Sequence, residues 1–112
     1  MSRVDFHIHT KFSDDGEFSP EEIIRQCEAC GMEWIAVTDH NCVRGVAEAL
    51  KAAVKVRVIR GVELDCVYRG QNFHLLGYGI DVNREEFAAV EQDILQQERR
   101  AAEEKMRLFR QA

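Results

Sequence analysis

The segment from Val4 to Thr10 constrains the fold more than any other stretch, because polar and apolar side chains alternate along it. Alternation with a period of two predicts an extended strand whose successive side chains lie on opposite faces. The polar face would hold Asp5, His7 and His9, and the apolar face Val4, Phe6 and Ile8. Imidazole nitrogens two residues apart on a strand can bind the same cation, so this strand predicts a metal-binding face.

Signals for helices and strands alternate along the rest of the chain. Ser19-Pro20-Glu21-Glu22 is typical of a helix N-terminus, with Ser19 as the cap, Pro20 in the first helical position and Glu22 completing a capping box. Gly31 indicates the end of that helix. A second helix is expected at about 43–53, and apolar runs predict strands at 34–38, 56–64 and 73–80.

The last two predicted strands are joined by a turn at 69–72. A parallel crossover needs a longer connection, so these strands are expected to form a hairpin. The order of elements favours an α/β fold with mostly parallel strands. Residues 83–112 predict a long helix capped by Asn83, whose apolar positions thin out in its middle.

Charge and cysteine usage narrow the classes of function. A net charge of −5 argues against a basic surface, and we do not expect stable binding of duplex nucleic acid. No apolar run is long enough to span a membrane and no secretory leader is visible, so a cytoplasmic location is expected. Cys27 and Cys30 lie on the apolar side of a predicted helix, where small buried residues are a better interpretation than a zinc site.

Each predicted strand offers candidate metal ligands, either within it or directly after it. In parallel α/β folds the carboxyl ends of the strands collect functional groups, so these side chains are expected to converge. A mixed set of imidazoles and carboxylates suits Zn, Mn or Fe in a site with more than one ion. Simpler interpretations stay open, since a lone His is often a core residue, His40 can cap a helix, and Asp14 and Asp15 are common in turns. The candidates are His7, His9, Asp14, Asp15, Asp39, His40, Glu63 and His74.

Five motifs, in this order, resemble the polymerase and histidinol phosphatase (PHP) superfamily of metal-dependent phosphoesterases. They are Asp-x-His-x-His-Thr from Asp5, Ser-Asp-Asp-Gly before Ser-Pro-Glu-Glu, Thr-Asp-His-Asn from Thr38, Gly-Val-Glu from Gly61, and His-Leu-Leu-Gly-Tyr from His74. The resemblance implies a distorted seven-stranded (β/α) barrel, of which residues 1–82 would form the first half. Residues 83–112 would be the long helix that begins a helical insertion, or an assembly element.

The resemblance also implies a site with two to three divalent metal ions. His7 and His9 would hold one ion, Glu63 would bridge it to a second that His74 binds, and Asp14 or Asp15 would hold a third with His40. Spacing from His9 favours Asp14. Asp5 and Asp39 would orient imidazoles, and Asp39 and His40 are the candidate catalytic residues. The implied reaction is hydrolysis of a phosphate ester, with a nucleotide or short oligonucleotide as the substrate.

The chain departs from the family pattern after His74, because no later His supplies the family's downstream ligands. We therefore expect the 112-residue chain alone to bind metal weakly and to turn over little substrate. Two alternatives remain at this stage. One is a histidinol-phosphate phosphatase, and the other is a non-catalytic metal-binding or assembly module that self-associates through its C-terminal helix.

Overall fold

The computed structural model describes residues 3–111, which form four strands and three helices. Their order along the chain alternates strands and helices before a final hairpin and a long helix, as the sequence predicts. The elements are β1 (Val4–Ile8), α1 (Pro20–Ala29), β2 (Trp34–Val37), α2 (Arg44–Ala52), β3 (Arg57–Tyr68), β4 (Gln71–Tyr78) and α3 (Glu85–Gln111).

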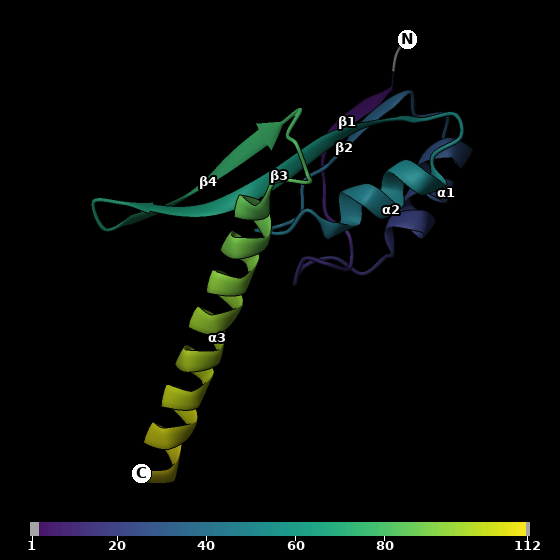
Figure 1. Cartoon of the computed structure of the whole chain (residues 1–112). Helices are drawn as coiled ribbons and strands as arrows, with labels where there is room; N and C mark the ends of the chain where they lie inside the picture. Colours follow the sequence, from purple (N-terminus) through teal and green to yellow (C-terminus); the bar gives the residue numbers. More distant parts are fainter. Residues whose placement is uncertain (1–2, 112) are drawn as a thin grey trace.

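The four strands form one sheet in the order β1-β2-β3-β4. β1, β2 and β3 are parallel, and β3 and β4 are antiparallel, which confirms the α/β class and the predicted hairpin. Figure 1 shows α1 and α2 together on one side of the sheet, while the β3–β4 hairpin and α3 extend away from this body. Within residues 3–111, no helix combines the length and apolar character needed to cross a membrane.

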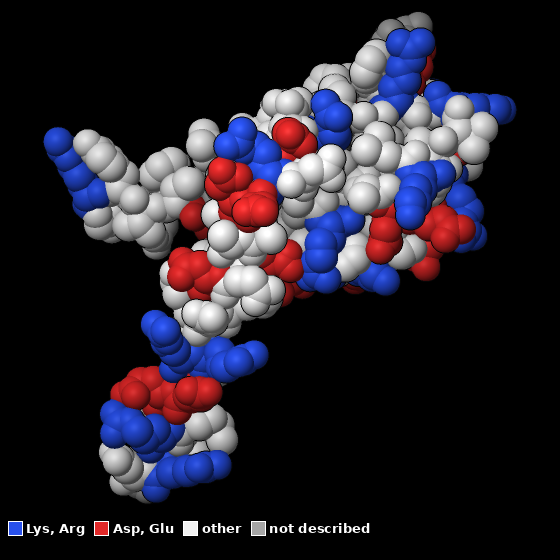
Figure 2. All heavy atoms as spheres, viewed as in Figure 1, with Lys and Arg blue, Asp and Glu red and all other residues white. Residues whose placement is uncertain are grey.

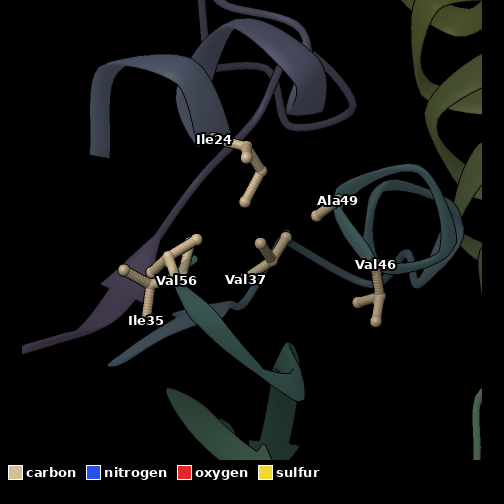
Figure 3. Close-up of a cluster of buried hydrophobic side chains, with 6 residues drawn as sticks. All are labelled: Ile24, Ile35, Val37, Val46, Ala49 and Val56. Atoms are coloured by element: carbon tan, nitrogen blue, oxygen red, sulfur yellow. The ribbon is translucent and has the colours of Figure 1, made fainter. Parts of the chain in front are cut away.

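The core lies between the sheet and the two short helices. Ile35, Ala36 and Val37 of β2 are completely buried, as expected for a central strand covered on both faces. Figure 3 shows Ile24 of α1 and Ala49 of α2 directed toward the side chains of β2, and Val56, just before β3, completes this part of the cluster. This cluster contains Ile24, Ile35, Val37, Val46, Ala49 and Val56.

The boundaries of α1 follow the predicted signals. Ser19 is the N-cap, and its hydroxyl accepts a hydrogen bond from the backbone N–H of Glu22. Gly31, with φ of 76°, follows the helix in the left-handed conformation that glycine adopts without strain. Cys30 is exposed at the C-cap, so the prediction that it is buried is wrong.

The β3–β4 hairpin is longer than predicted because its turn is tight. The loop contains only Arg69 and Gly70, with φ of 50° and 78°, as in the turns that match the twist of paired strands. β3 therefore continues to Tyr68 rather than ending at Leu64. This extension adds polar positions to the strand beyond Glu63.

α3 begins at Glu85, two residues after the predicted cap Asn83. None of its residues is buried. Figure 2 shows basic and acidic side chains following one another along the projecting part of this helix, as on a solvated helix surface. An ion pair between Arg44 and Glu91, with 2.8 Å between Nε and Oε1, links the first half of α3 to α2.

A β-bulge interrupts the predicted alternation of β1. Asp5 aligns with Ile35 of β2, and Ile8 aligns with Val37, so β1 uses one more residue than β2 over the same length. Aligned residues of parallel strands project from the same face. Because Ile35 and Val37 face the helices, Asp5 and Ile8 also lie on the helix-covered face.

The bulge changes the side-chain assignment made for β1. Burial, followed by the charge of Asp5, raises the pKa of the Cys27 thiol on α1, in keeping with a position of Asp5 on the helix side of the sheet. The prediction that Asp5 shares a face with His7 and His9 is wrong. The Asp5 carboxylate accepts the backbone N–H of His7 and so supports the bulge itself.

Candidate metal centre

The backbone brings the segment after β2 beside the middle of β3. The N–H of Glu63 donates to the carbonyl of Asp39 at 3.0 Å, and the N–H of Asn41 donates to the carbonyl of Glu63 at 2.9 Å. These two bonds extend the parallel pairing beyond β2 and hold His40 level with Glu63. β1 and β4 then supply the remaining imidazoles from either side.

Glu63 is the centre of the cluster. Its Oε1 lies 2.6 Å from His7 Nε2 and 2.8 Å from His9 Nε2. Its Oε2 lies 2.6 Å from His74 Nδ1. The side chain of Glu63 is only 4% exposed, so three imidazoles from β1, the β1 end and β4 surround a buried carboxylate.

Burial acts to raise the pKa of Glu63, but hydrogen bonds with His7 and His9 outweigh it and lower this pKa to about 2. The carboxylate is therefore ionised across the physiological range. A buried ionised carboxylate is costly unless positive charge or donors surround it. The three surrounding imidazoles fulfil that condition either with protons or with a bound cation.

A second carboxylate, that of Asp15, contacts the His9 ring nitrogen that faces away from Glu63. Both oxygens of Asp15 lie 2.9 Å from His9 Nδ1, and Oδ2 lies 3.6 Å from His40 Nε2. Burial acts to lower the pKa of His9, but its bonds with Glu63 and Asp15 raise this pKa above its ordinary value. Burial acts to raise the pKa of Asp15, and pairing with His9 lowers it.

Three overlapping groups in the described residues have the donors that a metal ion requires. Within each group the candidate ligand atoms lie within 4.8 Å of one another. Imidazole nitrogens and carboxylate oxygens suit zinc, manganese and iron, and the residues present therefore fit divalent cations. The groups are His7, His9 and Glu63; His9, Asp15 and His40; and His40, Glu63 and His74.

The structure places Asp15, rather than Asp14, beside the imidazoles. Asp14 is exposed and belongs to none of the three groups, although spacing favoured it in the sequence. The loop after β1 is folded by hydrogen bonds from Ser13 N–H to Thr10 C=O and from Gly16 N–H to Ser13 C=O, each 3.0 Å long. Residue spacing alone does not show which of the two adjacent carboxylates such a loop directs toward the imidazoles.

Asp39 lies outside the metal-ligand groups and is 1% exposed. Its Oδ1 accepts the Thr10 N–H at 2.6 Å and the Ser13 hydroxyl at 2.8 Å, and its Oδ2 accepts the Thr10 hydroxyl at 2.7 Å. The Ser13 hydroxyl in turn accepts the backbone N–H of His40 at 2.9 Å. The carboxylate thus holds the loop after β1 against the loop after β2. None of its hydrogen bonds within the described residues is to an imidazole.

The pattern of motifs and the fold lead to one family. A family model described as PHP domain matches residues 5–108. This chain belongs to the PHP domain family. Its mixed sheet of three parallel strands and one antiparallel strand is the part of the predicted PHP-type barrel that these residues form.

Relatives of this PHP chain include named enzymes of nucleotide chemistry. A 3',5'-nucleoside bisphosphate phosphatase from Chromobacterium violaceum is 36% identical over 83 residues, which is 72% of this chain and 29% of that protein. A 5'-3' exoribonuclease from Haemophilus influenzae is 32% identical over 90 residues, 79% of this chain and 32% of that protein. This PHP chain thus spans about a third of the length of the curated relatives it matches.

A solved structure gives the same fold. It is described as an amidohydrolase from Chromobacterium violaceum with bound sulfate and no metal. The likeness has a TM-score of 0.73 at 33% identity, and covers 81% of this PHP chain and 33% of that one. The fold of this PHP chain is therefore also present in a solved protein that is one third identical to it.

Asp65 also lies beside the imidazoles of this PHP domain, although the sequence pattern did not predict it as a site residue. Its Oδ1 lies 3.1 Å from His40 Nδ1 and 3.4 Å from His74 Nε2. The predicted strand ended at Leu64, which left Asp65 out of the pattern. The signal was present, since Asp65 is two residues after Glu63 and the two share one face of a continuous strand.

A cavity of about 340 Å³ opens beside the imidazole cluster of this PHP domain. The lining comes from the loop after β1, the segment around His40, the hairpin and the first half of α3. Its basic member is Arg44, which pairs with Glu91 and stacks over the Phe12 ring with 4.8 Å between the guanidinium carbon and the ring centroid. The lining residues are Phe12, Ser13, Asp14, Asp15, His40, Asn41, Cys42, Arg44, Asp65, His74, Glu91, Ile94, Leu95 and Glu98.

Proposed function

We propose that this PHP domain serves a metal-dependent phosphoesterase, with its reaction centre at the cluster around Glu63. One observation carries the proposal: a buried, ionised carboxylate contacts three imidazoles that come from separate strands. A folded chain gathers such groups at a cost in desolvation. Binding of cations is the function that explains why all these side chains converge on one point.

The proposed ligands are the members of the three overlapping groups. His7 and His9 would hold one cation with Glu63, which would share a second with His74. Asp15 and His40, with His9, would hold a third, so we replace Asp14 by Asp15 in the proposed ligand set. Zinc, manganese and iron fit this donor set, with two to three ions per site.

Divalent cations in such a site supply a water of lowered pKa and neutralise charge on phosphoryl oxygens. The chain's own residues would fix the positions at which this chemistry occurs. Glu63 stays ionised, His40 and Asp15 face each other across 3.6 Å, and Asp39 holds the two loops together. We therefore propose a positioning role for Asp39, with His40 as the residue that contacts the reacting groups.

The substrate we propose is a nucleotide or a short oligonucleotide. The names of the relatives from Chromobacterium violaceum and Haemophilus influenzae support this class, and the sulfate bound by the solved relative is a tetrahedral anion like phosphate. The cavity beside the imidazole cluster is open to such a substrate. Its many carboxylates make cations necessary before a phosphate can approach.

Metal binding by the 112-residue chain is the first test. Equilibrium dialysis against Zn²⁺ or Mn²⁺, followed by elemental analysis, would measure stoichiometry and affinity. Glu63→Gln should abolish this binding because it removes the carboxylate that the three imidazoles share, whereas Asp93→Asn on the exposed surface of α3 should leave binding unchanged. Equal binding by the wild type and the Glu63→Gln variant would refute the proposed centre.

Turnover decides between the remaining alternatives. Phosphate release from a 3',5'-nucleoside bisphosphate, a short oligoribonucleotide and histidinol phosphate should be compared, and we expect the nucleotide substrates to react faster. Release that is fastest with histidinol phosphate would favour the alternative phosphatase.

The assembly alternative and the division into residues 1–82 and 83–112 stay predictions. Light scattering over a dilution series tests whether α3, which exposes Leu108 and Phe109, self-associates.

A further inference from the structure

We propose that Asp65 is a positioning residue that sets the imidazole tautomer of His40. This inference rests on the proposed metal centre. Asp65 belongs to none of the three ligand groups, yet one of its oxygens lies between two imidazoles that do. A carboxylate that accepts the outer N–H of a ligating imidazole fixes the ring and the nitrogen available to the metal.

The hairpin places Asp65 at this point by register. Asp65 of β3 is directly opposite His74 of β4, so the two side chains project from the same face of the antiparallel pair. Glu63 is two residues before Asp65 and lies on that face as well. The two carboxylates therefore contact opposite ring nitrogens of His74: Glu63 Oε2 is 2.6 Å from Nδ1, and Asp65 Oδ1 is 3.4 Å from Nε2.

The Asp65 side chain is half exposed, and Asn41 holds its carboxylate in place. The Asn41 amide donates to Asp65 Oδ2 at 3.0 Å, and the Asp65 N–H donates to Asn41 Oδ1 at 2.9 Å. Asn41 has φ of 53°, a left-handed conformation that asparagine tolerates better than most residues. This reciprocal pair leaves Oδ1 of Asp65 free to accept from the imidazoles.

His40 is the clearest case of tautomer selection. Among residues 3–111, its ring has one hydrogen bond, between Nδ1 and Asp65 Oδ1 at 3.1 Å. An ionised carboxylate only accepts, so a neutral His40 must carry its proton on Nδ1. The lone pair of Nε2 is then directed to the side on which Asp15 lies, and His40 is committed to the group that contains His9 and Asp15.

The tautomer of His40 can be measured without any metal. Long-range ¹H–¹⁵N correlation spectra of the metal-free chain, at a pH where the imidazoles are neutral, distinguish Nδ1–H from Nε2–H. We expect Nδ1–H for His40 in the wild type and Nε2–H in Asp65→Ala. Asp65→Leu, which has a side chain of comparable size but no hydrogen-bond acceptor, is the second variant if Asp65→Ala does not fold, and Asp93→Ala is the matched surface control.

Zinc affinity, measured on the same proteins, gives the second result. Loss of a carboxylate that orients a ligating imidazole lowers metal affinity about 10- to 100-fold, so we expect a decrease in this range for Asp65→Ala and none for Asp93→Ala. A His40 tautomer that is Nε2–H in the wild type, or that Asp65→Ala leaves unchanged, would overturn the inference. An affinity that stays within a factor of three of the wild type would overturn it as well.

The two results separate this inference from the proposed function. If the wild-type chain binds no zinc but His40 changes tautomer in Asp65→Ala, the metal centre is refuted and the positioning role of Asp65 is supported. If zinc binds tightly and the tautomer does not depend on Asp65, the metal centre is supported and the positioning role is refuted.

Discussion

Replacing Asp39 by alanine tests whether this residue holds the site together or carries out chemistry in it. In the structure its carboxylate is buried and accepts three hydrogen bonds, from the N–H and hydroxyl of Thr10 and from the hydroxyl of Ser13. Asp39→Ala removes the acceptor and leaves three donors in a region that water does not reach freely. We therefore expect a loss of folding stability in addition to any loss of metal binding.

The magnitude follows from the kind of donor. A buried donor left without an acceptor costs about 1–3 kcal/mol. The Thr10 N–H cannot turn away and should cost about 2 kcal/mol, whereas the two hydroxyls can rotate and should each cost about 1 kcal/mol. The total for Asp39→Ala is about 4 kcal/mol. Asp39→Asn keeps an oxygen for the Thr10 N–H and loses mainly the charge, so about 1 kcal/mol is expected.

Urea unfolding followed by the fluorescence of Trp34 measures this difference. With a slope of about 2 kcal/mol per molar urea, Asp39→Ala should lower the midpoint by about 2 M and Asp39→Asn by about 0.5 M. Ser13→Ala removes one of the three donors and the acceptor for the His40 N–H, and should fall between them. If the free energy of unfolding of Asp39→Ala is within 1 kcal/mol of the wild-type value, the structural role argued for Asp39 is incorrect.

Two further predictions concern contacts outside the proposed ligands. A Cβ at Gly45 would lie 2.7 Å from Asp39 Oδ2 and 2.9 Å from Thr10 Oγ1, so Gly45→Ala should destabilise the chain by about 1–3 kcal/mol in thermal unfolding, and an unchanged Tm would contradict this. Hydrogen bonds from the N–H groups of Lys55, Val56 and Val54 lower the pKa of Glu28, so its contribution to stability is present above its unfolded pKa of about 4.3 and is lost as pH falls through the lower folded value. Wild type should therefore exceed Glu28→Gln in stability at pH 7, and the difference should shrink below about pH 4, whereas a constant difference from pH 7 to pH 2 would refute this linkage.

The parts of the fold that local pattern determines were predicted from the sequence. Ser19 and Pro20 begin α1 because a side-chain cap and a residue without an N–H both suit the first helical turn. β2 was recognisable because a short apolar run can be buried on both faces. The hairpin followed from the length of its connection, which excludes a parallel crossover.

Features that depend on neighbouring segments were not predictable in this way. The bulge in β1 exists only relative to β2, and it moves Asp5 to the helix-covered face. Asp15 and Asp14 are adjacent in the sequence, and the hydrogen bonds of the loop after β1 decide which of them lies beside His9. Burial of Asp39 likewise results from two loops meeting, which no spacing in either loop encodes.

The same distinction explains why Glu63 was found and Asp65 was missed. An isolated carboxylate in an apolar strand is conspicuous because burial without a partner is costly, so Glu63 called for a cation or donors on energetic grounds alone. Asp65 is half exposed, so its charge is not desolvated in this way. Its place beside the imidazoles follows only from its register opposite His74 and from its hydrogen bonds with Asn41. A proposed metal ligand such as Glu63 can thus be inferred from the free-energy cost of burying its charge. A residue that orients such ligands can be identified only from the pairing of the strands.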